Sequence, residues 1–523
     1  MNIVLIHPYI NNLTRDSFLS EPLGLLCLAT YIEQKFSDVT VDILDLYADG
    51  ASSPIRNGKF WTMGVSDPTE IARRLKALQP DLIGIHCNFT AYADDSLEVA
   101  QVARDTLHDV PIVIGGAHPT IEGEAILEEC PAVDIVARGE GELILANIVR
   151  MLKGEISIEE IPGVSYRRFP NETSTAAEII SNPPQPLMDS LDDLPIPSRK
   201  YIDMDRYKNF NKKTIWYVKN SPVATIMTSR GCPYDCVFCS TKVVWERNWR
   251  FRSLENIFAE IEQLHRDYGI REFVINDDQF MTQRKRVHAF CDYFIEKKLD
   301  ISFSVDAGLS VWLVDVAILA KMKRAGFYAL RFPIETGSKK TLKYVNKPVN
   351  LDKARTMIAE ANKLRFWISA NIIVGFPDET RADVLESIQY VYDSSLDFTS
   401  FLIAKPNAGA KLYEDMRDKG LLGQNVVRGS DFYHSDYDTI HLTAQELTEI
   451  VNRAHGMWFS HKLKFYLKPH NFIAFLLPKL RTRDGVRYSL RVFTQLIKRK
   501  LFPALQQSLR GITRPARGLE INN

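Results

Sequence analysis

The stretch RGCPYDCVFCS, residues 230–240, places three of the chain's seven cysteines within eight positions. Cys232, Cys236 and Cys239 have the spacing C-x3-C-x2-C and follow directly on VATIMTS, an apolar segment that we expect to form a strand. Three thiolates close together suit a soft metal or an iron–sulfur cluster. A structural zinc site usually has four ligands, and this loop offers no fourth cysteine or histidine. The spacing therefore favours an iron–sulfur cluster with one open iron, with a zinc loop or a chance cluster as the alternative.

The composition is that of an ordinary globular protein. The chain has 523 residues, of which 45% are hydrophobic and 25% charged, and this length predicts two to four domains. The formal net charge is zero, so nothing global points to nucleic acid. The N-terminal MNIVLIHP is typical of a strand rather than a signal peptide, and no apolar run is long enough to span a bilayer. We therefore expect a cytoplasmic protein, and we interpret the isolated cysteines as core residues: Cys27, Cys87, Cys130 and Cys291.

The hydrophobic pattern divides the chain into four regions. Residues 1–155 alternate apolar strands with helices, which predicts a parallel sheet covered on both faces, that is, a doubly wound Rossmann-like α/β domain. Residues 156–215 are predicted to be a linker with a small hairpin at IPGVSYRR. Six further strand–helix units in residues 216–410 predict a partial (β/α)6 barrel, with its chemistry at the C-terminal strand ends. Residues 411–523 are predicted to be helical.

The cysteine spacing, placed after the first strand of a partial barrel, resembles the radical S-adenosylmethionine (SAM) superfamily. Later segments with the same resemblance are FVINDDQF (273–280), FPIETGSKKTLKYVNK (332–347), NIIVGFPDET (371–380) and IAKPNAGAKLYEDM (403–416). The last of these departs from the family pattern P-G-T-x-L-Y, because residues 407–410 read N-A-G-A. The resemblance implies that the three cysteines hold a [4Fe–4S] cluster whose open iron binds SAM.

The same resemblance assigns roles to residues at the strand ends. It implies that SAM is bound by Phe238, Asp277, Gly337 and Gly375, with Gly375 allowing the adenine to approach the backbone. It implies catalytic roles for Asp278 and Glu335. Each position also has an ordinary structural interpretation: the paired aspartates as a helix cap, Glu335 as a partner in an ion pair, and Gly375 as a turn residue.

Residues 1–155 resemble the cobalamin-binding domain that is fused to one large class of radical SAM enzymes. The matching segments are EPLGLLCLATYIE (21–33), VIGGAHPT (113–120), VARGEGE (136–142) and the linker LDDLPIPSR (191–199). The resemblance implies that cobalamin is bound by Gly115, Gly116, His118, Gly139, Glu140 and Gly141. Glycines at strand ends are by themselves equally compatible with a nucleotide-binding or flavodoxin-like domain.

One departure concerns the cobalt ligand. Many cobalamin proteins carry D-x-H-x-x-G after the first strand, and its histidine ligates cobalt from below. Here the segment IHPYINNLTRDSF contains His7 without the Asp or the Gly, so we interpret His7 as a strand-end residue and predict cobalt without a protein histidine below it. Candidates to line that lower face are Asn88, Phe89, Thr90 and Tyr92.

Taken together, the resemblances imply a cobalamin-dependent radical SAM methyltransferase. It would form a 5′-deoxyadenosyl radical and transfer a methyl group to an unactivated carbon of a small-molecule or lipid substrate, with flavodoxin or ferredoxin as the electron donor. The first alternative is a B12-binding radical SAM enzyme that does not methylate, such as one that performs ring contraction or oxidative cyclisation. A remote alternative is a non-catalytic cobalamin or redox sensor, which would not need an open cluster iron.

The C-terminal region is strongly basic. Residues 461–523 contain fourteen Lys or Arg against two acidic residues, a net charge of +12. In GVRYSLRVFTQLIKRKLFP, residues 485–503, apolar side chains recur near helical spacing with basic residues between them. One interpretation is a solvated helical cap over the barrel mouth. The other is a peripheral contact with the inner face of the membrane through residues 461–523, which would favour a hydrophobic substrate.

Overall fold

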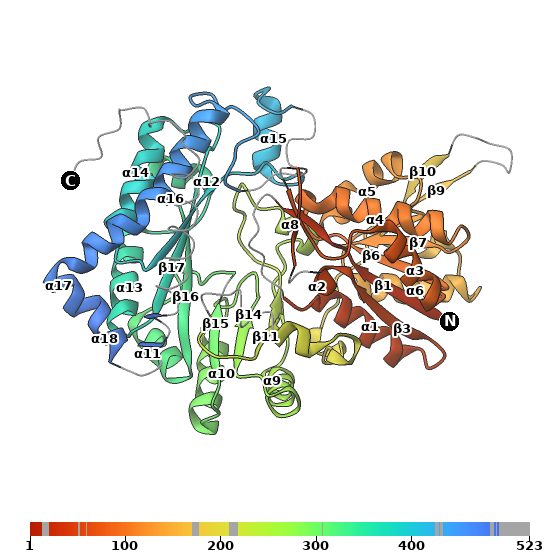
Figure 1. The fold of residues 1–523 in the computed structure, drawn as a ribbon, viewed down its shortest axis with the longest axis horizontal. Coiled ribbons are helices and arrows are strands. Elements are labelled where there is room, and N and C mark those ends of the chain that lie inside the picture. The colour runs from red at the N-terminus through yellow and green to blue at the C-terminus, as the bar shows by residue number, and fades with distance from the viewer. Residues whose placement is uncertain are drawn as a thin grey trace.

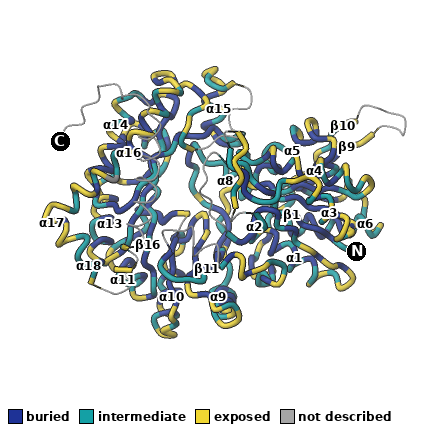
Figure 2. The backbone as a smooth tube through the Cα atoms, in the orientation of Figure 1, coloured by how far each residue is buried: buried dark blue, intermediate teal, exposed yellow. Residues whose placement is uncertain are grey.

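The computed structural model describes residues 1–12, 20–50, 53–58, 60–169, 177–208, 218–305, 307–423, 428, 432–481, 486–487 and 489–490. Two α/β bodies lie side by side, the N-terminal one in red to orange and the second in green to blue (Figure 1). Buried and half-buried residues follow the strands of both sheets, and exposed residues mark the outward faces of the helices (Figure 2). The predicted fold class is confirmed: a Rossmann-like domain followed by a partial barrel and a helical C-terminal region.

The first sheet has seven strands in the order β10-β9-β8-β7-β6-β1-β3. Five of them are parallel and correspond to the apolar segments of the sequence: β1 (Asn2–His7), β3 (Thr40–Asp45), β6 (Leu82–His86), β7 (Ile112–Gly115) and β8 (Ile135–Ala137). The hairpin expected at IPGVSYRR instead pairs β9 (Val164–Arg168) with the more distant β10 (Glu178–Ser181). β9 extends this sheet antiparallel to β8, and β10 is antiparallel to β9. Part of the predicted linker thus belongs to the first sheet.

Helices cover both faces of this sheet, as the continuous apolar strands predict. One face carries α1 (Leu23–Lys35) and α6 (Gly141–Leu152), and the other carries α3 (Pro68–Leu78), α4 (Ala93–Thr106) and α5 (Ala117–Glu129). The start of α5 differs from the sequence prediction, in which PIVIGGAHPT, residues 111–120, forms one strand. Gly116 has φ +126°, a backbone conformation outside the strand region, and the helix begins directly after it.

The second sheet is the partial barrel, with six parallel strands in chain order and open edges at β11 and β18. The strands are β11 (Val223–Ile226), β14 (Glu272–Ile275), β15 (Ser302–Val305), β16 (Phe327–Glu335), β17 (Trp367–Val374) and β18 (Phe398–Ile403). Their outer side chains pack under the helices α9 (Leu254–Tyr268), α10 (Arg284–Lys297), α11 (Val316–Arg324), α13 (Leu351–Lys363) and α14 (Arg381–Tyr392). The sequence predicted all six strands, because each is a short apolar run followed by a helical pattern.

Two small sheets were not predicted. One is the antiparallel trio β2 (Ile10–Asn12), β5 (Phe60–Met63) and β4 (Ile55–Asn57). The other pairs β12 (Ser229–Arg230) with β13 (Arg250–Phe251), on either side of the cysteine loop. Strands of two to four residues are too short to give a periodic signal.

The C-terminal region continues with α15 (Lys411–Asp418), α16 (Ala444–Leu467), α17 (Pro469–Asn471), the π-helical η5 (Phe472–Leu476) and α18 (Leu477–Leu480). Buried Lys479 donates to both carboxylate oxygens of Asp397, which directly precedes β18, at 2.7 and 2.6 Å. Residues 461–481 therefore lie at the N-terminal ends of the barrel strands, so the predicted cap over the mouth is wrong for this part. The predicted helix 485–503 lies almost wholly outside the described residues, among which no helix is long and apolar enough to cross a membrane.

A candidate cofactor site between the two domains

The cysteine loop is held by hydrogen bonds to three other segments of the barrel domain. Gly231, which begins the loop at φ +88°, donates its N–H to Asp278 Oδ2 at 3.2 Å. Further along, Val237 donates to the carbonyl of Val345 at 3.1 Å and accepts from the N–H of Leu412 at 2.8 Å. Segments that follow β14, β16 and β18 thus hold the loop that follows β11, at the C-terminal end of the barrel.

All three cysteines are free thiols within this loop. Burial raises the pKa of Cys232 to about 11 and that of Cys236 to about 12, and the ammonium of Lys347 opposes the shift at both. The thiols of Cys232 and Cys236 are therefore protonated until a metal binds, because coordination removes the proton. In the described ranges no three His, Cys, Asp or Glu side chains converge on a point for one metal ion. The donor chemistry, three soft ligands on one loop, fits a [4Fe–4S] cluster with one open iron.

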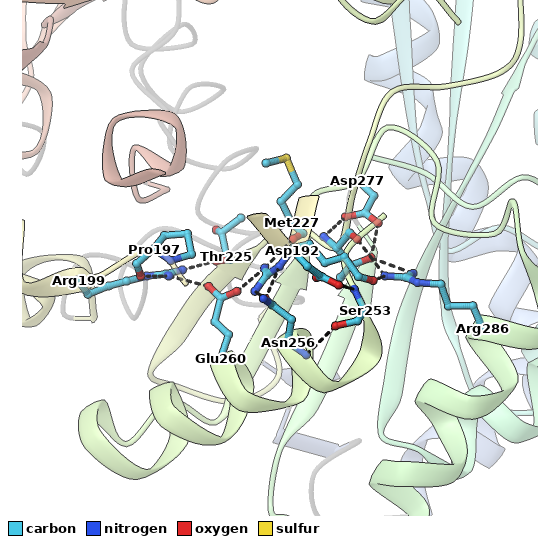
Figure 3. A network of polar contacts seen from close by, with 12 residues as sticks. Asp192, Pro197, Arg199, Thr225, Met227, Ser253, Asn256, Glu260, Asp277 and Arg286 are labelled. Atoms are coloured by element: carbon cyan, nitrogen blue, oxygen red, sulfur yellow. Dashed lines mark hydrogen bonds and ion pairs between the residues drawn. The ribbon is translucent and has the colours of Figure 1, made fainter. Parts of the chain in front are cut away.

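The two neighbouring aspartates position the backbone. Asp277 belongs to the network of polar contacts in Figure 3. It is fully buried, and its carboxylate accepts from Thr228 N at 2.6 Å, Thr228 Oγ1 at 2.5 Å and Ser229 Oγ at 2.7 Å. Its oxygens are thus engaged by the strand that leads into the cysteine loop. Asp278 orients Gly231, and burial raises its pKa. Neither caps a helix, because the N-cap of α10 is Gln283.

Glu335 ends β16 with φ +68° and accepts from Lys347 Nζ at 2.5 Å. Both side chains are almost fully buried, and the ammonium also lies 5.8 Å from the ring centre of Trp312. The ion-pair interpretation of Glu335 thus fits the geometry. Because Lys347 also acts on the pKa values of Cys232 and Cys236, the pair lies beside the cysteine loop. The sequence analysis missed Lys347, although it is the last residue of a segment that resembled the family.

An aromatic group lies beside the third cysteine. The rings of Phe238 and Phe376 are 6.3 Å apart, and Phe376 directly follows Gly375, which has φ +89°. Glu379 holds this turn, since its Oε2 accepts from Gly375 N at 2.8 Å and from Phe376 N at 3.1 Å. Burial raises the pKa of Glu379 to about 7. Phe238 and Gly375 are thus brought together, as contacts to one adenine would require.

Gly337 is placed differently from the other predicted SAM contacts. It is packed against α14, where a Cβ would come within 2.4 Å of Tyr390 Cβ, and its N–H donates to Ser387 Oγ at 3.1 Å. The geometry explains this glycine by close packing between the loop after β16 and α14.

In the first domain, the predicted cobalamin contacts gather at the C-terminal edge of the sheet. Gly115 ends β7, and a Cβ on Gly116 would lie 2.5 Å from the carbonyl oxygen of Cys87. His118 is buried, and its Nδ1 lies 3.1 Å from Thr90 Oγ1. Its Nε2 has no hydrogen-bond partner among the described residues, and burial lowers its pKa to about 4. His118 thus presents a neutral imidazole with a free Nε2, next to the point where the backbones of Gly116 and Cys87 come close together. This arrangement fits a large polar cofactor.

His7 is engaged within the protein. Its Nδ1 lies 3.0 Å from Asp45 Oδ1, and Tyr207 donates to the other oxygen of the same carboxylate. Phe89, one of the candidates for the lower face, is 65% exposed on the loop after β6. An exposed aromatic side chain at the sheet edge is available to a ligand, whereas His7 already has a partner.

Glu140 joins the two domains. Its carboxylate, in the loop before α6, accepts from Arg230 Nη1 at 2.7 Å, from Arg250 Nη1 and Nη2 at 2.8 and 3.1 Å, and from Met188 N at 2.8 Å. Glu142 pairs with the same Arg230 at 2.6 Å. All of these acidic and basic side chains are buried. Hydrogen-bond donors of the protein therefore occupy the carboxylate of Glu140. The resemblance implied instead that Glu140 contacts cobalamin.

The two glycines on either side of Glu140 have different surroundings. Gly139 has φ +106°, and a Cβ there would meet no atom within 4 Å. Gly141 begins α6, and a Cβ would lie 3.1 Å from Leu28 Cδ2. Gly139 is therefore the more open of the two.

The first domain and the linker also close one edge of the barrel sheet. In the edge strand β11, Thr225 donates its N–H to Glu21 Oε2 at 2.8 Å, and its carbonyl accepts from Arg199 Nη2 at 2.9 Å. Arg199 is paired with buried Glu260 at 2.6 Å (Figure 3). Side chains thus satisfy the edge groups that an open sheet leaves unpaired.

The cysteine loop meets the first domain directly. It continues into α8 (Thr241–Trp245), which contacts α5 of the first domain. Gly409 of the loop after β18 lies in the same junction, where a Cβ would come within 2.6 Å of Val243 and 3.5 Å of Ile121. The cysteine loop, the loop after β18 and the helix that starts near Gly116 therefore meet at one place.

Two family models match the chain, one in each domain. The model described as the radical SAM superfamily matches residues 226–391, and the B12 binding domain matches residues 14–149. The chain therefore contains a radical SAM domain and a B12-binding domain. It is an enzyme, and its cofactors are a [4Fe–4S] cluster, SAM and cobalamin.

Curated relatives match most of the length of the chain. An uncharacterised methyltransferase of Pyrococcus horikoshii is 29% identical over 476 residues, which are 91% of this chain and 94% of the relative. The cytidylyl-2-hydroxyethylphosphonate methyltransferase of Streptomyces wedmorensis is 28% identical, over 77% of this chain and 78% of the relative. The solved structure of the cobalamin-dependent SAM radical enzyme OxsB has a TM-score of 0.67 at 16% identity, over 95% of this chain and 75% of that chain. This last likeness establishes a shared fold.

Proposed function

We propose that the protein is a cobalamin-dependent radical SAM methyltransferase that acts on an unactivated carbon of a hydrophobic or natural-product substrate. The observation that carries the proposal is the junction of α8 with α5, because it joins the cysteine loop to the edge of the first domain that holds Gly116 and His118. The methyltransferase names of the relatives from Pyrococcus horikoshii and Streptomyces wedmorensis support the reaction type.

The cofactors, when bound, supply reductive cleavage of SAM to a 5′-deoxyadenosyl radical and a methyl group for transfer. The chain's own residues position them. Cys232, Cys236 and Cys239 hold the cluster, and Asp278 fixes the loop through the N–H of Gly231. Phe238, with the turn that Glu379 fixes through two backbone N–H groups, offers an apolar surface to the adenine. In this proposal, Asp278 acts through the cysteine loop and Glu335 acts through its ion pair with Lys347.

On the cobalamin side, Gly115 and Gly116 let the cofactor approach the sheet edge, and the Nε2 of His118 contributes a polar contact. The buried ion pairs of Glu140 hold the two domains in one arrangement. A fixed arrangement is important for radical chemistry, because the reacting groups must stay in place while water is excluded.

The experiment uses protein purified without oxygen and reconstituted with iron, sulfide and hydroxocobalamin. We would add methyl-deuterated SAM and a strong reductant, then quantify three products by mass spectrometry: 5′-deoxyadenosine, S-adenosylhomocysteine and labelled methylcobalamin. All three are expected from a methyltransferase. Deoxyadenosine without labelled methylcobalamin would favour the non-methylating alternative.

The redox partner in this proposal is a flavodoxin or a ferredoxin, because the cluster must receive one electron from outside the chain. The substrate is a small molecule or a lipid. A direct comparison of 5′-deoxyadenosine formation with flavodoxin and with ferredoxin decides between the two redox proteins.

A peripheral membrane contact is proposed for the C-terminal region. Leu467 and Ile473 are 72% and 61% exposed, and the neighbouring cations Lys464 and Lys468 are exposed as well. This surface lies at the opposite end of the barrel from the cysteine loop, so such a contact would tether the enzyme rather than deliver substrate to the mouth. Equal flotation of the full chain and a Leu467→Glu/Ile473→Glu variant on anionic vesicles would end this part of the proposal.

A further inference from the structure

The inside of the barrel carries side chains that neither the cluster nor SAM accounts for. Along β16, Leu330, Phe332 and Ile334 are buried in the core beneath the outer helices. Side chains alternate between the two faces of a strand. The half-buried residues between them, Ala329, Arg331 and Pro333, therefore face the barrel interior. An arginine is thus placed inside the barrel of a radical enzyme.

Arg331 lines a small cavity, partly open to solvent, between β16, β17 and β18. The register places Ser369 opposite Arg331, and Phe398 opposite Ser369. Arg331 Nε donates to Ser369 Oγ at 3.4 Å. Trp367 and Phe398 form one wall, with stacked rings whose centres are 6.0 Å apart. The cavity therefore combines one cation with an aromatic surface.

Half-buried Arg331 has no acidic partner among the described residues, unlike three buried arginines near the contact between the domains. Arg199 pairs with Glu260, Arg230 with Glu140 and Glu142, and Arg250 with Glu140. Across the described ranges, no ion pair includes Arg331, and its one hydrogen bond goes to a neutral hydroxyl. A half-buried guanidinium without a counter-ion can bind an anion through several of its N–H groups at once.

We propose that Arg331 is the specificity-determining residue of the substrate site and binds an anionic group of the substrate, a phosphate, phosphonate or carboxylate. The apolar part of the substrate lies against Trp367 and Phe398. This inference rests on the proposed function, because it names the substrate class of that same barrel: an amphipathic molecule with one anionic end.

The strand also sets the length of such a substrate. Arg331 precedes Glu335, the last residue of β16, by four residues, which correspond to about 13 Å at the strand rise of ~3.3 Å per residue. On β17, half-buried Asn371 is the next inward-facing residue after Ser369 toward the C-terminal ends of the strands. Ser400 of β18 lies opposite Asn371. The substrate must therefore span on the order of 10 Å between its anionic group and the carbon that reacts at the barrel mouth.

The test compares two probes of similar shape, phenyl phosphate and benzyl alcohol, by calorimetric titration of the reconstituted holoenzyme under anaerobic conditions. The variants are Arg331→Gln and Arg331→Lys. The matched control is Arg324→Gln, which removes one exposed arginine from α11 on the outside of the barrel.

We expect the wild type and Arg324→Gln to bind phenyl phosphate more tightly than benzyl alcohol. We expect at least a tenfold loss of phenyl phosphate affinity in Arg331→Gln and a smaller loss in Arg331→Lys, because a charge-assisted hydrogen bond contributes about 1.5–3 kcal/mol. Equal affinity of the wild type for the two probes would overturn the inference, as would unchanged phosphate binding in Arg331→Gln.

The outcome is separable from that of the proposed function. Wild-type protein that binds phenyl phosphate but forms neither 5′-deoxyadenosine nor labelled methylcobalamin would contradict the proposed reaction and leave the anion site in place. Wild-type protein that forms these products but shows no preference for phenyl phosphate would support the proposed reaction and contradict the anion site. If Arg331→Gln does not fold, the comparison of the two probes on the wild type and on Arg331→Lys still decides.

Discussion

Replacement of Glu140 by alanine is expected to weaken the connection between the domains more than any exposed ion pair could. The Glu140 side chain is fully buried and accepts from Arg230, Arg250 and the backbone of Met188. Arg230 keeps Glu142 as a partner, but Arg250 loses its acidic partner and keeps only the carbonyl of Met188. Breaking a buried pair on one side costs about 3–5 kcal/mol, because the other charge stays buried.

The matched control is Glu129→Ala. Glu129 also lies in the first domain and also binds an arginine from far along the chain, Arg428, at 2.6 Å, but its side chain is 36% exposed. An exposed pair contributes about 0–1 kcal/mol. The two variants thus remove the same chemical group and differ in burial.

The assay is urea unfolding followed by tryptophan fluorescence. With a denaturant slope of about 3–5 kcal/mol/M for a chain of this size, Glu140→Ala should lower the unfolding midpoint by about 1 M, and Glu129→Ala by about 0.2 M or less. Arg230 is two residues from Cys232, so Glu140→Ala should also retain less iron after reconstitution. Equal midpoints for the two variants would refute the reasoning.

Three further predictions concern the sites themselves. Cys236→Ala should lose the iron–sulfur absorption and 5′-deoxyadenosine formation, because the cluster then has two protein ligands; optical spectra and product analysis check this. Gly116→Ala should bind cobalamin at least tenfold more weakly in an absorbance titration. Gly116 has φ +126°, and a Cβ there would lie 2.5 Å from a backbone oxygen. The control Gly24→Ala, whose Cβ meets nothing within 4 Å, should bind cobalamin normally. Burial raises the pKa of Glu379 from 4.5 to about 7, so its protonated form stabilises the fold below pH 4.5 and this stabilisation is lost as the pH rises to 7. The melting temperature of the wild type relative to Glu379→Gln should therefore fall between pH 4.5 and 7.5, and a constant difference would contradict this.

The sequence predicted the parts of the fold that depend on local pattern. Each barrel strand is a short apolar run, and each parallel strand of the first domain lies between helical segments, so hydrophobic period and length identified them. The three cysteines are recognisable because their spacing along one loop is itself the signal. The start of α5 was misplaced, because the sequence does not reveal that Gly116 adopts φ +126°.

The partners of the charged side chains could not be predicted in the same way. Glu140 lies 90 residues before Arg230 and 110 before Arg250, and only the docking of the two domains brings them together. The sequence likewise places Arg331 on a strand without showing which face it occupies or that its neighbours are neutral. Such residues become candidates only when the fold shows which charges have counter-ions.

The measurement that tests the central claim most directly is the iron and acid-labile sulfide content of the reconstituted wild type, set against a variant with Cys232, Cys236 and Cys239 all replaced by alanine. The account predicts about four irons and four sulfides per chain in the wild type and essentially none in the variant. Stoichiometric zinc without sulfide in the wild type, or an unchanged cluster in the triple variant, would contradict it.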